Sequence, residues 1–259
     1  MGTVVILMNP INFGLRLTKQ DREILKHVQR HRMTTINVLH QLFFPDKSIA
    51  ALKSTLRRLC GREPECRFLA SAPLAGKRVY YYLTANGARF LGTSPDDSGP
   101  LGPQARYHRF AVLSFIHGAG DGKRTLFDPT RFQDVFPLRG HRLNRNDFFI
   151  DESGEMPKLG VLIVDHGARP RRIVAKTLQR LGRFFRNRWF DEFIRDRNFN
   201  VTILTLSEGK KAMLLPFLRQ AVRLCLARPN RDGLDQRIQS VEFSVVVVPT
   251  LQELLPGSW

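Results

Sequence analysis

The first third of the chain carries a helical hydrophobic period that gives way to a strand-like stretch. Apolar residues spaced for one helix face predict an amphipathic helix over residues 18–32. Thr18 and Asp21 stand three positions apart at its start, which is the spacing of a capping box. The same period predicts two further helices, over residues 34–44 and 48–60. We therefore expect three consecutive helices before the first strand.

The predicted third helix separates apolar from basic positions. Four apolar residues at i, i+3, i+7 and i+10 are expected to point inward: Ile49, Leu52, Leu56 and Leu59. The outer face is left to Lys47, Lys53, Ser54, Arg57 and Arg58. Arg and Lys on such a face can reach phosphates or guanine edges, and a helix fits the major groove of DNA. These five residues are the first candidate DNA contacts.

A hairpin and a short helix follow the three helices. Residues 66–84 (CRFLASAPLAGKRVYYYLT) predict two strands, with Lys77 and Arg78 beside the turn, and residues 85–91 predict a closing helix. This order is that of a winged helix-turn-helix, in which the third helix enters a DNA groove and a basic hairpin lies beside it. We predict such a DNA-binding domain over residues 15–92. A winged helix that binds protein is the alternative.

Positive charge is concentrated in this first part of the chain. Residues 1–91 contain 15 Lys and Arg against 5 Asp and Glu, a net charge of +10, whereas residues 92–259 contain 26 against 18, a net charge of +8. The whole chain has a formal net charge of +18 and a pI near 10.8. Basic side chains that neutralise phosphates release condensed counterions, so this excess favours double-stranded DNA as the partner.

A second domain is expected after a linker over residues 93–103, where Pro, Gly, Ser and Asp cluster. This domain would cover residues 104–259. Its predicted helices span residues 107–119, 169–195 and 212–227, and its predicted strands span residues 147–150, 159–165, 200–206 and 241–248. Helices that follow strands in this way indicate an α/β sandwich around a partly parallel sheet.

The acidic residues of the second domain invite comparison with a nuclease. Two-metal phosphodiester hydrolysis uses acids on neighbouring strands with a Lys nearby, and Asp147, Asp165 and Lys176 are the candidate catalytic residues. The motif is incomplete: Ile163 stands two positions before Asp165, where a metal-binding Glu would be expected, and Gly167 stands where Lys is needed. We therefore expect an inactive nuclease-like domain. Mg²⁺ would be a cofactor only if the nuclease alternative held.

The long helix predicted over residues 169–195 has a basic face. Its basic residues at i, i+4, i+8 and i+11 are Arg172, Lys176, Arg180 and Arg183. Charges of one sign on one face repel each other unless an anion neutralises them. We expect this face to be a second nucleic-acid surface, and a merely solvated face is the alternative.

Few other motifs change this picture. No phosphate-binding glycine loop is present, so no cofactor is expected. His27 and His31 have i, i+4 spacing, but no Cys or third His lies near them in sequence, and we expect a helix surface rather than a metal site. No apolar run approaches the roughly 18 residues that span a bilayer, so no membrane partner is expected. Three cysteines without CxxC spacing suit a reducing cytoplasm.

Several segments carry a family likeness: LTKQDREILKHV, AALKSTLRRL, YYYLTANGARFLG and HRFAVLSF. With these, the chain resembles the replication-relaxation family of plasmids and other bacterial mobile elements. The block NDFFID…LGVLIVDHGARPRRIVAKT resembles the part where such proteins keep a restriction-nuclease-like sheet, except that Ile163 stands where relatives tend to have Glu. The resemblance implies an accessory DNA-binding protein that acts in plasmid replication, copy control or mobilisation.

Two other functions stay open at this point. One is a metal-dependent DNA nuclease that uses Asp147 and Asp165. The other is an adaptor that docks onto a relaxase, a replication initiator or another protein complex. A homodimer is compatible with each of these interpretations.

Overall fold

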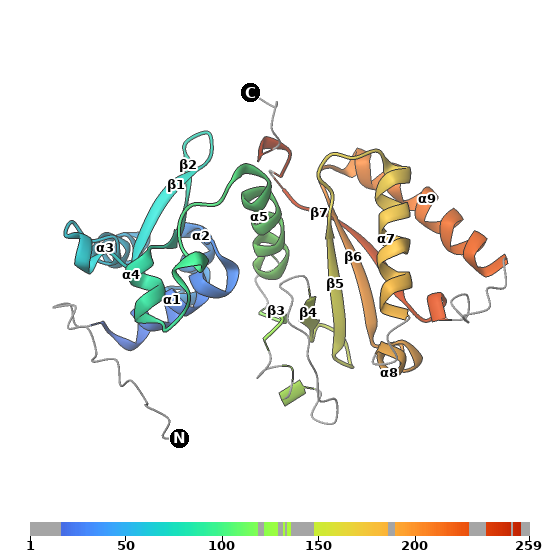
Figure 1. Ribbon diagram of the computed structural model, residues 1–259, viewed down its shortest axis with the longest axis horizontal. Coiled ribbons are helices and arrows are strands. Elements are labelled where there is room, and N and C mark those ends of the chain that lie inside the picture. The colour runs from blue at the N-terminus through green and yellow to red at the C-terminus, as the bar shows by residue number, and fades with distance from the viewer. Residues whose placement is uncertain are drawn as a thin grey trace, which may run out of the picture. The chain divides into compact units, whose positions relative to one another are not determined.

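The fold is described from a computed structural model. The described residues are 17–118, 122–128, 132, 134–135, 148–185, 190–227, 237–249 and 251–254. The chain divides into two compact units, Met1–Pro100, called here the first unit, and Leu101–Trp259, the second unit (Figure 1). Each unit has a hydrophobic core of its own.

The first unit places helices before and after an antiparallel hairpin. Its elements are α1 (Lys19–His31), α2 (Ile36–Phe43), α3 (Ile49–Leu59), β1 (Leu69–Ala75), β2 (Arg78–Leu83) and α4 (Ala85–Phe90). Short 3-10 turns occur at Pro64–Cys66 and Pro95–Asp97. The predicted order of three helices, hairpin and closing helix is confirmed.

Polar side chains define where the helices of the first unit begin. The hydroxyl of Thr18 accepts a hydrogen bond from the backbone N–H of Asp21 (3.2 Å), and the carboxylate of Asp21 accepts one from the backbone N–H of Thr18 (2.8 Å). The predicted capping box is therefore confirmed. Thr35 and Ser48 cap α2 and α3 through the first of these two bonds, each hydroxyl accepting a hydrogen bond from the backbone N–H three residues on. Each such cap stabilises its helix by about 1 kcal/mol.

The core of the first unit forms where the apolar sides of the helices meet the hairpin. Leu52, Leu56 and Leu59 of α3 are buried, as predicted. Ile49 is 45% exposed, so its predicted inward position was wrong. Ile49 is the first residue of α3, and its side chain lies beyond the part of the helix that the core covers.

The hairpin is joined to the segment between α1 and α2. β1 pairs with β2 in antiparallel register, from Leu69 opposite Leu83 to Ala75 opposite Arg78. Thr34 forms an isolated antiparallel bridge with Tyr81 of β2, with hydrogen bonds of 3.0 and 2.9 Å in the two directions. These backbone bonds hold the hairpin against the helices.

The stretch predicted as a linker is largely part of the first unit. Arg32 forms an ion pair with Asp97, and the backbone N–H of Gly99 donates a 2.8 Å hydrogen bond to the carbonyl of Leu83. The next helix begins at Pro103. The chain between the units is therefore shorter than residues 93–103.

The second unit contains a mixed five-stranded sheet with helices on both faces. Its elements are α5 (Pro103–His117), β3 (Arg124–Leu126), β4 (Phe148–Asp151), β5 (Lys158–Val164), α7 (Pro170–Phe185), α8 (Asp191–Arg195), β6 (Phe199–Thr205), α9 (Glu208–Ala227) and β7 (Glu242–Val247). A 3-10 turn follows at Leu251–Leu254. The strand order is β3-β4-β5-β6-β7; the first three strands are antiparallel, and β5, β6 and β7 are parallel. The predicted partly parallel sheet is confirmed.

The helices of the second unit form two layers around the sheet. α7 and α9 cover one face, and α5 lies on the other (Figure 1). On the α7 side, Ile173, Leu214 and Leu218 pack against Ile203 and Val245 of the sheet. This arrangement buries every residue of β6 and packs α5 against β5 and β6.

Candidate nucleic-acid interface

The outer side of α3 carries three exposed polar side chains, those of Lys53, Ser54 and Arg57. They are exposed because the opposite side of the helix is buried in the core through Leu52 and Leu56. The helix contains no acidic residue. Among the described residues, no carboxylate forms an ion pair with Lys53 or Arg57. These cations are therefore available to a phosphate.

Lys47 lies just before the start of α3 and is also exposed. Its ammonium group is 5.7 Å from the centroid of the Phe44 ring. Because Phe44 is buried, this ring gives the Lys47 side chain a fixed support while its charge stays in solvent. Lys47 therefore stays in the candidate interface.

The guanidinium of Arg58 is paired within the first unit, although part of the side chain is exposed. Its guanidinium donates two hydrogen bonds, of 2.8 and 2.6 Å, to the carboxylate of Asp21 in α1. The Asp21 side chain is only 1% exposed, and that of Arg58 is 36% exposed. Burial alone would raise the pKa of Asp21, but hydrogen bonds from Arg58 and Thr18 outweigh it and lower the pKa. The prediction that Arg58 belongs to the outer face of α3 is therefore corrected, and we leave it out of the interface.

The basic residues of the hairpin lie at its turn. Gly76 has a positive φ of 53°, a conformation that glycine adopts without strain, and it opens the turn between β1 and β2. Lys77 and Arg78 follow directly, and both are exposed. The structure therefore places two cations at the tip of the hairpin, as predicted.

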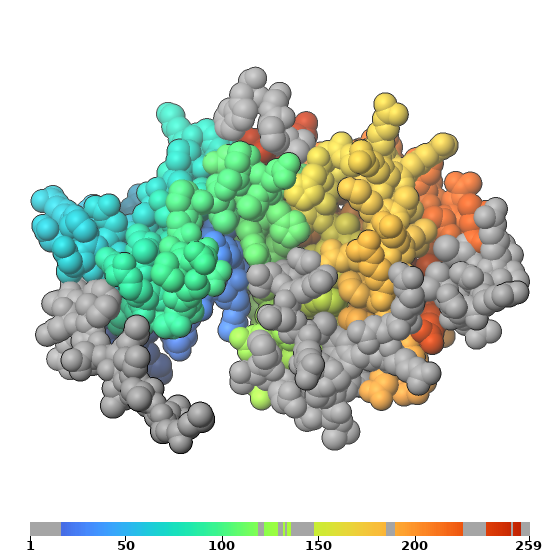
Figure 2. All heavy atoms as spheres, viewed as in Figure 1, coloured from blue at the N-terminus to red at the C-terminus, as the bar shows by residue number. Residues whose placement is uncertain are grey.

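The basic helix α7 presents three of its four predicted cations to solvent. Arg172, Lys176 and Arg183 are exposed, and Figure 2 shows α7 on an open face of the second unit. No acidic group of the described chain pairs with any of the three. Arg180 is half-buried: its guanidinium donates a 3.5 Å hydrogen bond to the carbonyl of Leu162 and lies 5.7 Å from the Phe184 ring centroid. Arg180 therefore contacts the sheet and is less exposed than Arg172, Lys176 and Arg183.

Asp165 is turned into the protein at the end of β5. Its side chain is fully buried; one carboxylate oxygen accepts the N–H of Gly167 (2.9 Å), and the other accepts the hydroxyl of Thr205 (3.0 Å). The Lys210 ammonium lies 4.0 Å from the second oxygen. With both oxygens bonded and no exposure, this carboxylate joins the ends of β5 and β6. Asp147, its proposed catalytic partner, lies outside the described residues.

Three aromatic side chains lie together beside Asp165: Tyr107, His108 and His166. The sequence alone did not indicate that they contact one another. The hydroxyl of Tyr107 in α5 donates a 2.5 Å hydrogen bond to the backbone carbonyl of Asp165. The exposed ring of His166 lies 5.1 Å from the Tyr107 ring and is stacked on His108 at 5.8 Å between centroids. His108 and His166 are far apart in sequence, so no local spacing could have indicated this contact.

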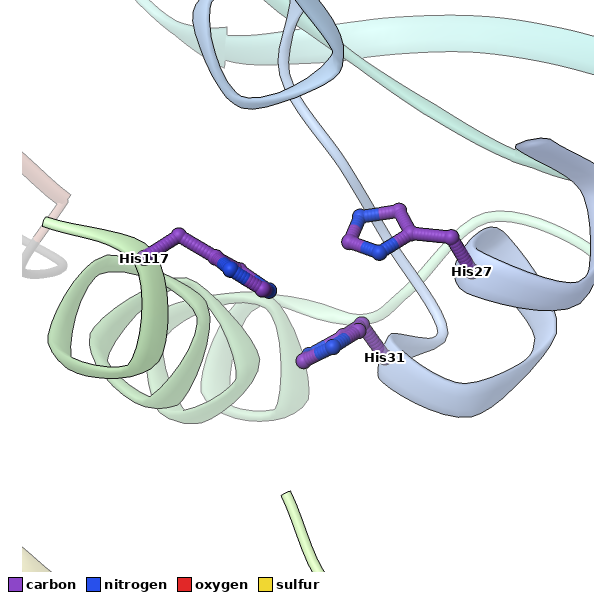
Figure 3. Close-up of side chains that lie close together, drawn as sticks. All are labelled: His27, His31 and His117. Atoms are coloured by element: carbon purple, nitrogen blue, oxygen red, sulfur yellow. The ribbon is translucent and has the colours of Figure 1, made fainter. Parts of the chain in front are cut away.

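His27 and His31 lie on the same side of α1 (Figure 3). Their ring centroids are 4.6 Å apart, and Nε2 of His27 is 3.0 Å from the hydroxyl of Thr34. Thr34 also bridges to the hairpin through its backbone. His27 therefore belongs to the contacts that hold α1 to the segment preceding α2.

Comparison with protein-family models, curated proteins and solved structures gives no match for this chain. Its function is therefore argued from the geometry above. Within the described residues, no helix has the length and apolar character to cross a membrane.

Proposed function

We propose that the first unit binds double-stranded DNA as a winged helix-turn-helix, with α3 in the major groove and the β1–β2 hairpin against the neighbouring backbone. The observation that carries this proposal is the exposed side of α3 formed by Lys53, Ser54 and Arg57, which has no acidic residue. Lys47 and the two cations at the hairpin tip extend this positive surface. Such side chains suit phosphate oxygens and guanine edges.

We also propose that the second unit is a nuclease-like scaffold without catalytic activity. Its antiparallel β3, β4 and β5, followed by parallel β6 and β7, support such a sheet. The buried and fully bonded carboxylate of Asp165 supports the absence of catalysis. The exposed cations of α7 give this unit a phosphate-binding surface instead.

In the cell, we propose an accessory role in the replication, copy control or mobilisation of a plasmid or another mobile element, carried out in the cytoplasm. The support is the resemblance of its segments to the replication-relaxation family, together with the net charge of +18. Site-specific binding by the first unit would position the protein, and the basic second unit would add affinity that does not depend on sequence.

Fluorescence anisotropy with the full chain and a labelled duplex tests the DNA interface. The variant Lys53→Ala/Arg57→Ala should bind about 10- to 100-fold more weakly, and the slope of log affinity against log salt should fall by about one for each of the two side chains that contacts a phosphate. The control is Lys26→Ala, which removes an exposed α1 cation that is already paired with Glu23. If the double variant and the control bind equally well, α3 is not the DNA-binding helix.

Sequencing of DNA fragments that co-purify with the tagged full chain tests the cellular role. We expect enrichment of a segment from a plasmid or mobile element, lost in the Lys53→Ala/Arg57→Ala variant. Nuclease-resistant capture of a relaxase or replication initiator without DNA enrichment would replace this role with that of an adaptor. Magnesium-dependent nicking of supercoiled plasmid, abolished by Asp165→Ala, would replace it with that of a nuclease.

A further inference from the structure

A group of aromatic and basic side chains gathers at the carboxyl end of β5. Tyr107 and His108 come from α5 and contact the ring of His166, which follows β5, and Lys176 of α7 acts electrostatically on His166. In an open α/β sheet, ligands bind beyond the carboxyl ends of parallel strands. β5 and β6 are parallel and end here, in the Asp165 and Thr205 pair. This group therefore lies beyond the carboxyl ends of β5 and β6.

Contacts within the group fix the position of His166. The hydrogen bond from Tyr107 to the carbonyl of Asp165 ties α5 to the end of β5. The His166 ring then lies against the Tyr107 ring and is stacked on His108, with only 13° between the two imidazole planes. Two imidazoles from different elements are therefore held side by side at the surface, and His166 is exposed.

The electrostatics of this group favour an anion. Asp165 is the adjacent acid, but its carboxylate points inward and is bonded to Gly167 and Thr205. Although His166 is exposed as a residue, partial desolvation of its ring lowers its pKa, and the charges of His108 and Lys176 lower the pKa further against the opposing effect of Asp165. These groups repel one another when charged, and a bound anion would relieve that repulsion.

We propose that His108, His166 and Lys176 form a phosphate-binding site at the carboxyl end of β5. Imidazole N–H groups and an ammonium are donors suited to phosphate oxygens. The phosphate belongs to the DNA backbone, because Lys176 lies on the same exposed side of α7 as Arg172, one turn earlier. The source of the phosphate depends on the DNA-binding function proposed above, whereas the site itself does not.

Imidazole NMR signals of the full chain, at one pH and low salt, test the site directly. Inorganic phosphate should shift the signals of His108 and His166, assigned from His108→Gln and His166→Gln. His117 at the end of α5 serves as the control, since its imidazole lies in the same unit and burial lowers its pKa to about 4. If His108 and His166 shift no more than His117, the site does not bind phosphate.

Duplex binding identifies the source of the phosphate. His166→Gln and Lys176→Gln should each weaken binding about 3- to 10-fold, and Lys176→Gln should lower the salt slope by about one. Arg195→Gln is the control, because it removes a cation that is 74% exposed on α8 in the same unit. Phosphate-induced shifts without loss of duplex affinity would assign the site to a free phosphate compound and overturn the DNA source.

Together, the duplex-binding and NMR measurements distinguish failure of this inference from failure of the proposed function. Unaltered binding by His166→Gln and Lys176→Gln, with a loss in Lys53→Ala/Arg57→Ala, would overturn only the DNA source of the phosphate. Unaltered binding by Lys53→Ala/Arg57→Ala, with phosphate shifts at His166, would overturn only the role of α3. Thermal unfolding of each variant shows whether a loss of duplex affinity reflects misfolding. If His166→Gln does not fold, the duplex affinity of Lys176→Gln decides the source of the phosphate.

Discussion

Arg57 and Arg58 are adjacent and chemically identical, yet the fold gives them different surroundings. Arg57 is exposed on the outer side of α3, whereas Arg58 reaches across to the buried carboxylate of Asp21. Asp21 is also the N3 residue of the capping box that Thr18 opens, so one carboxylate links the start of α1 to a second helix. The two arginines therefore allow binding and stability to be separated experimentally.

Arg58→Ala should destabilise the first unit, because it leaves the Asp21 carboxylate buried without its cation. Since Arg58 keeps about a third of its side chain in solvent, we expect a cost of about 1–3 kcal/mol, below that of a fully buried pair. Hydrogen exchange of peptides from residues 17–100 measures this cost. Arg57→Ala should leave exchange unchanged and weaken DNA binding. Equal exchange in both variants would contradict the structural role of Arg58.

The effect of Arg58→Ala should also depend on pH. The folded state lowers the pKa of Asp21, so the pair contributes its full stability above the ordinary pKa of an aspartate. That contribution is lost as the pH falls through the lowered pKa and the carboxylate becomes protonated. The difference in exchange between the wild type and Arg58→Ala should therefore narrow from pH 7 to pH 3. A constant difference would mean that the ion pair is not its cause.

Residue-level prediction from sequence succeeded where the signal is local. The capping box of Thr18 and Asp21 depends on two positions three apart, and the structure confirms it. Arg58 could not be assigned in this way, because its partner lies 37 positions earlier on another helix. The stacking of His108 on His166 likewise depends on how α5 packs against the sheet.

At the scale of elements, the pairing of β4 with β5 in the second unit depends on the close packing of Gly160 against the ring of Phe149. A Cβ added to Gly160 in β5 would lie 2.1 Å from ring carbons of Phe149 in the neighbouring β4. Phe149 is fully buried, with its ring 5.0 Å from that of Phe115 in α5. The ring therefore occupies the space that a side chain at position 160 would need, and this contact fits β4 and β5 beneath α5.

Gly160→Ala should destabilise the second unit by about 1–3 kcal/mol, because the buried ring cannot move aside without disturbing its neighbours. Denaturation followed by tryptophan fluorescence measures this, since both tryptophans of the chain belong to the second unit. The matched control is Gly182→Ala in α7, where a Cβ would meet nothing within 4 Å. That change should stabilise the unit by up to about 1 kcal/mol. An unchanged midpoint for Gly160→Ala would show that the ring relocates.

The bounds of an element could be predicted from sequence where they depend on neighbouring residues, and not where they depend on contacts with distant ones. Strands β5, β6 and β7 lie within one or two residues of their predicted ranges, because each is a short segment rich in β-branched residues. The predicted linker over residues 93–103 was too long, because Pro, Gly and Asp also mark turns that pack on a domain. Asp97, which pairs with Arg32, shows that such residues can be structural.

At the scale of the whole molecule, the two units differ in which elements carry their exposed positive charge. The first unit combines exposed cations on α3 with a hairpin tip, an arrangement suited to base edges and the adjacent backbone. The second unit carries exposed cations along α7, and in the proposed function their long side chains contact phosphates without reading sequence. The fold thus predicts that α3 governs specificity and that α7 governs general affinity.

This division can be tested by comparing specific and random duplexes across a salt series. Arg172→Gln/Lys176→Gln/Arg183→Gln should weaken binding to both duplexes by the same factor and lower the salt slope by about three, because each side chain neutralises one phosphate. The ratio of the two affinities should stay constant. Lys53→Ala/Arg57→Ala should instead reduce that ratio, since a lost base contact costs about 1–3 kcal/mol of discrimination. A reduced ratio in the α7 variant would mean that the second unit also reads sequence.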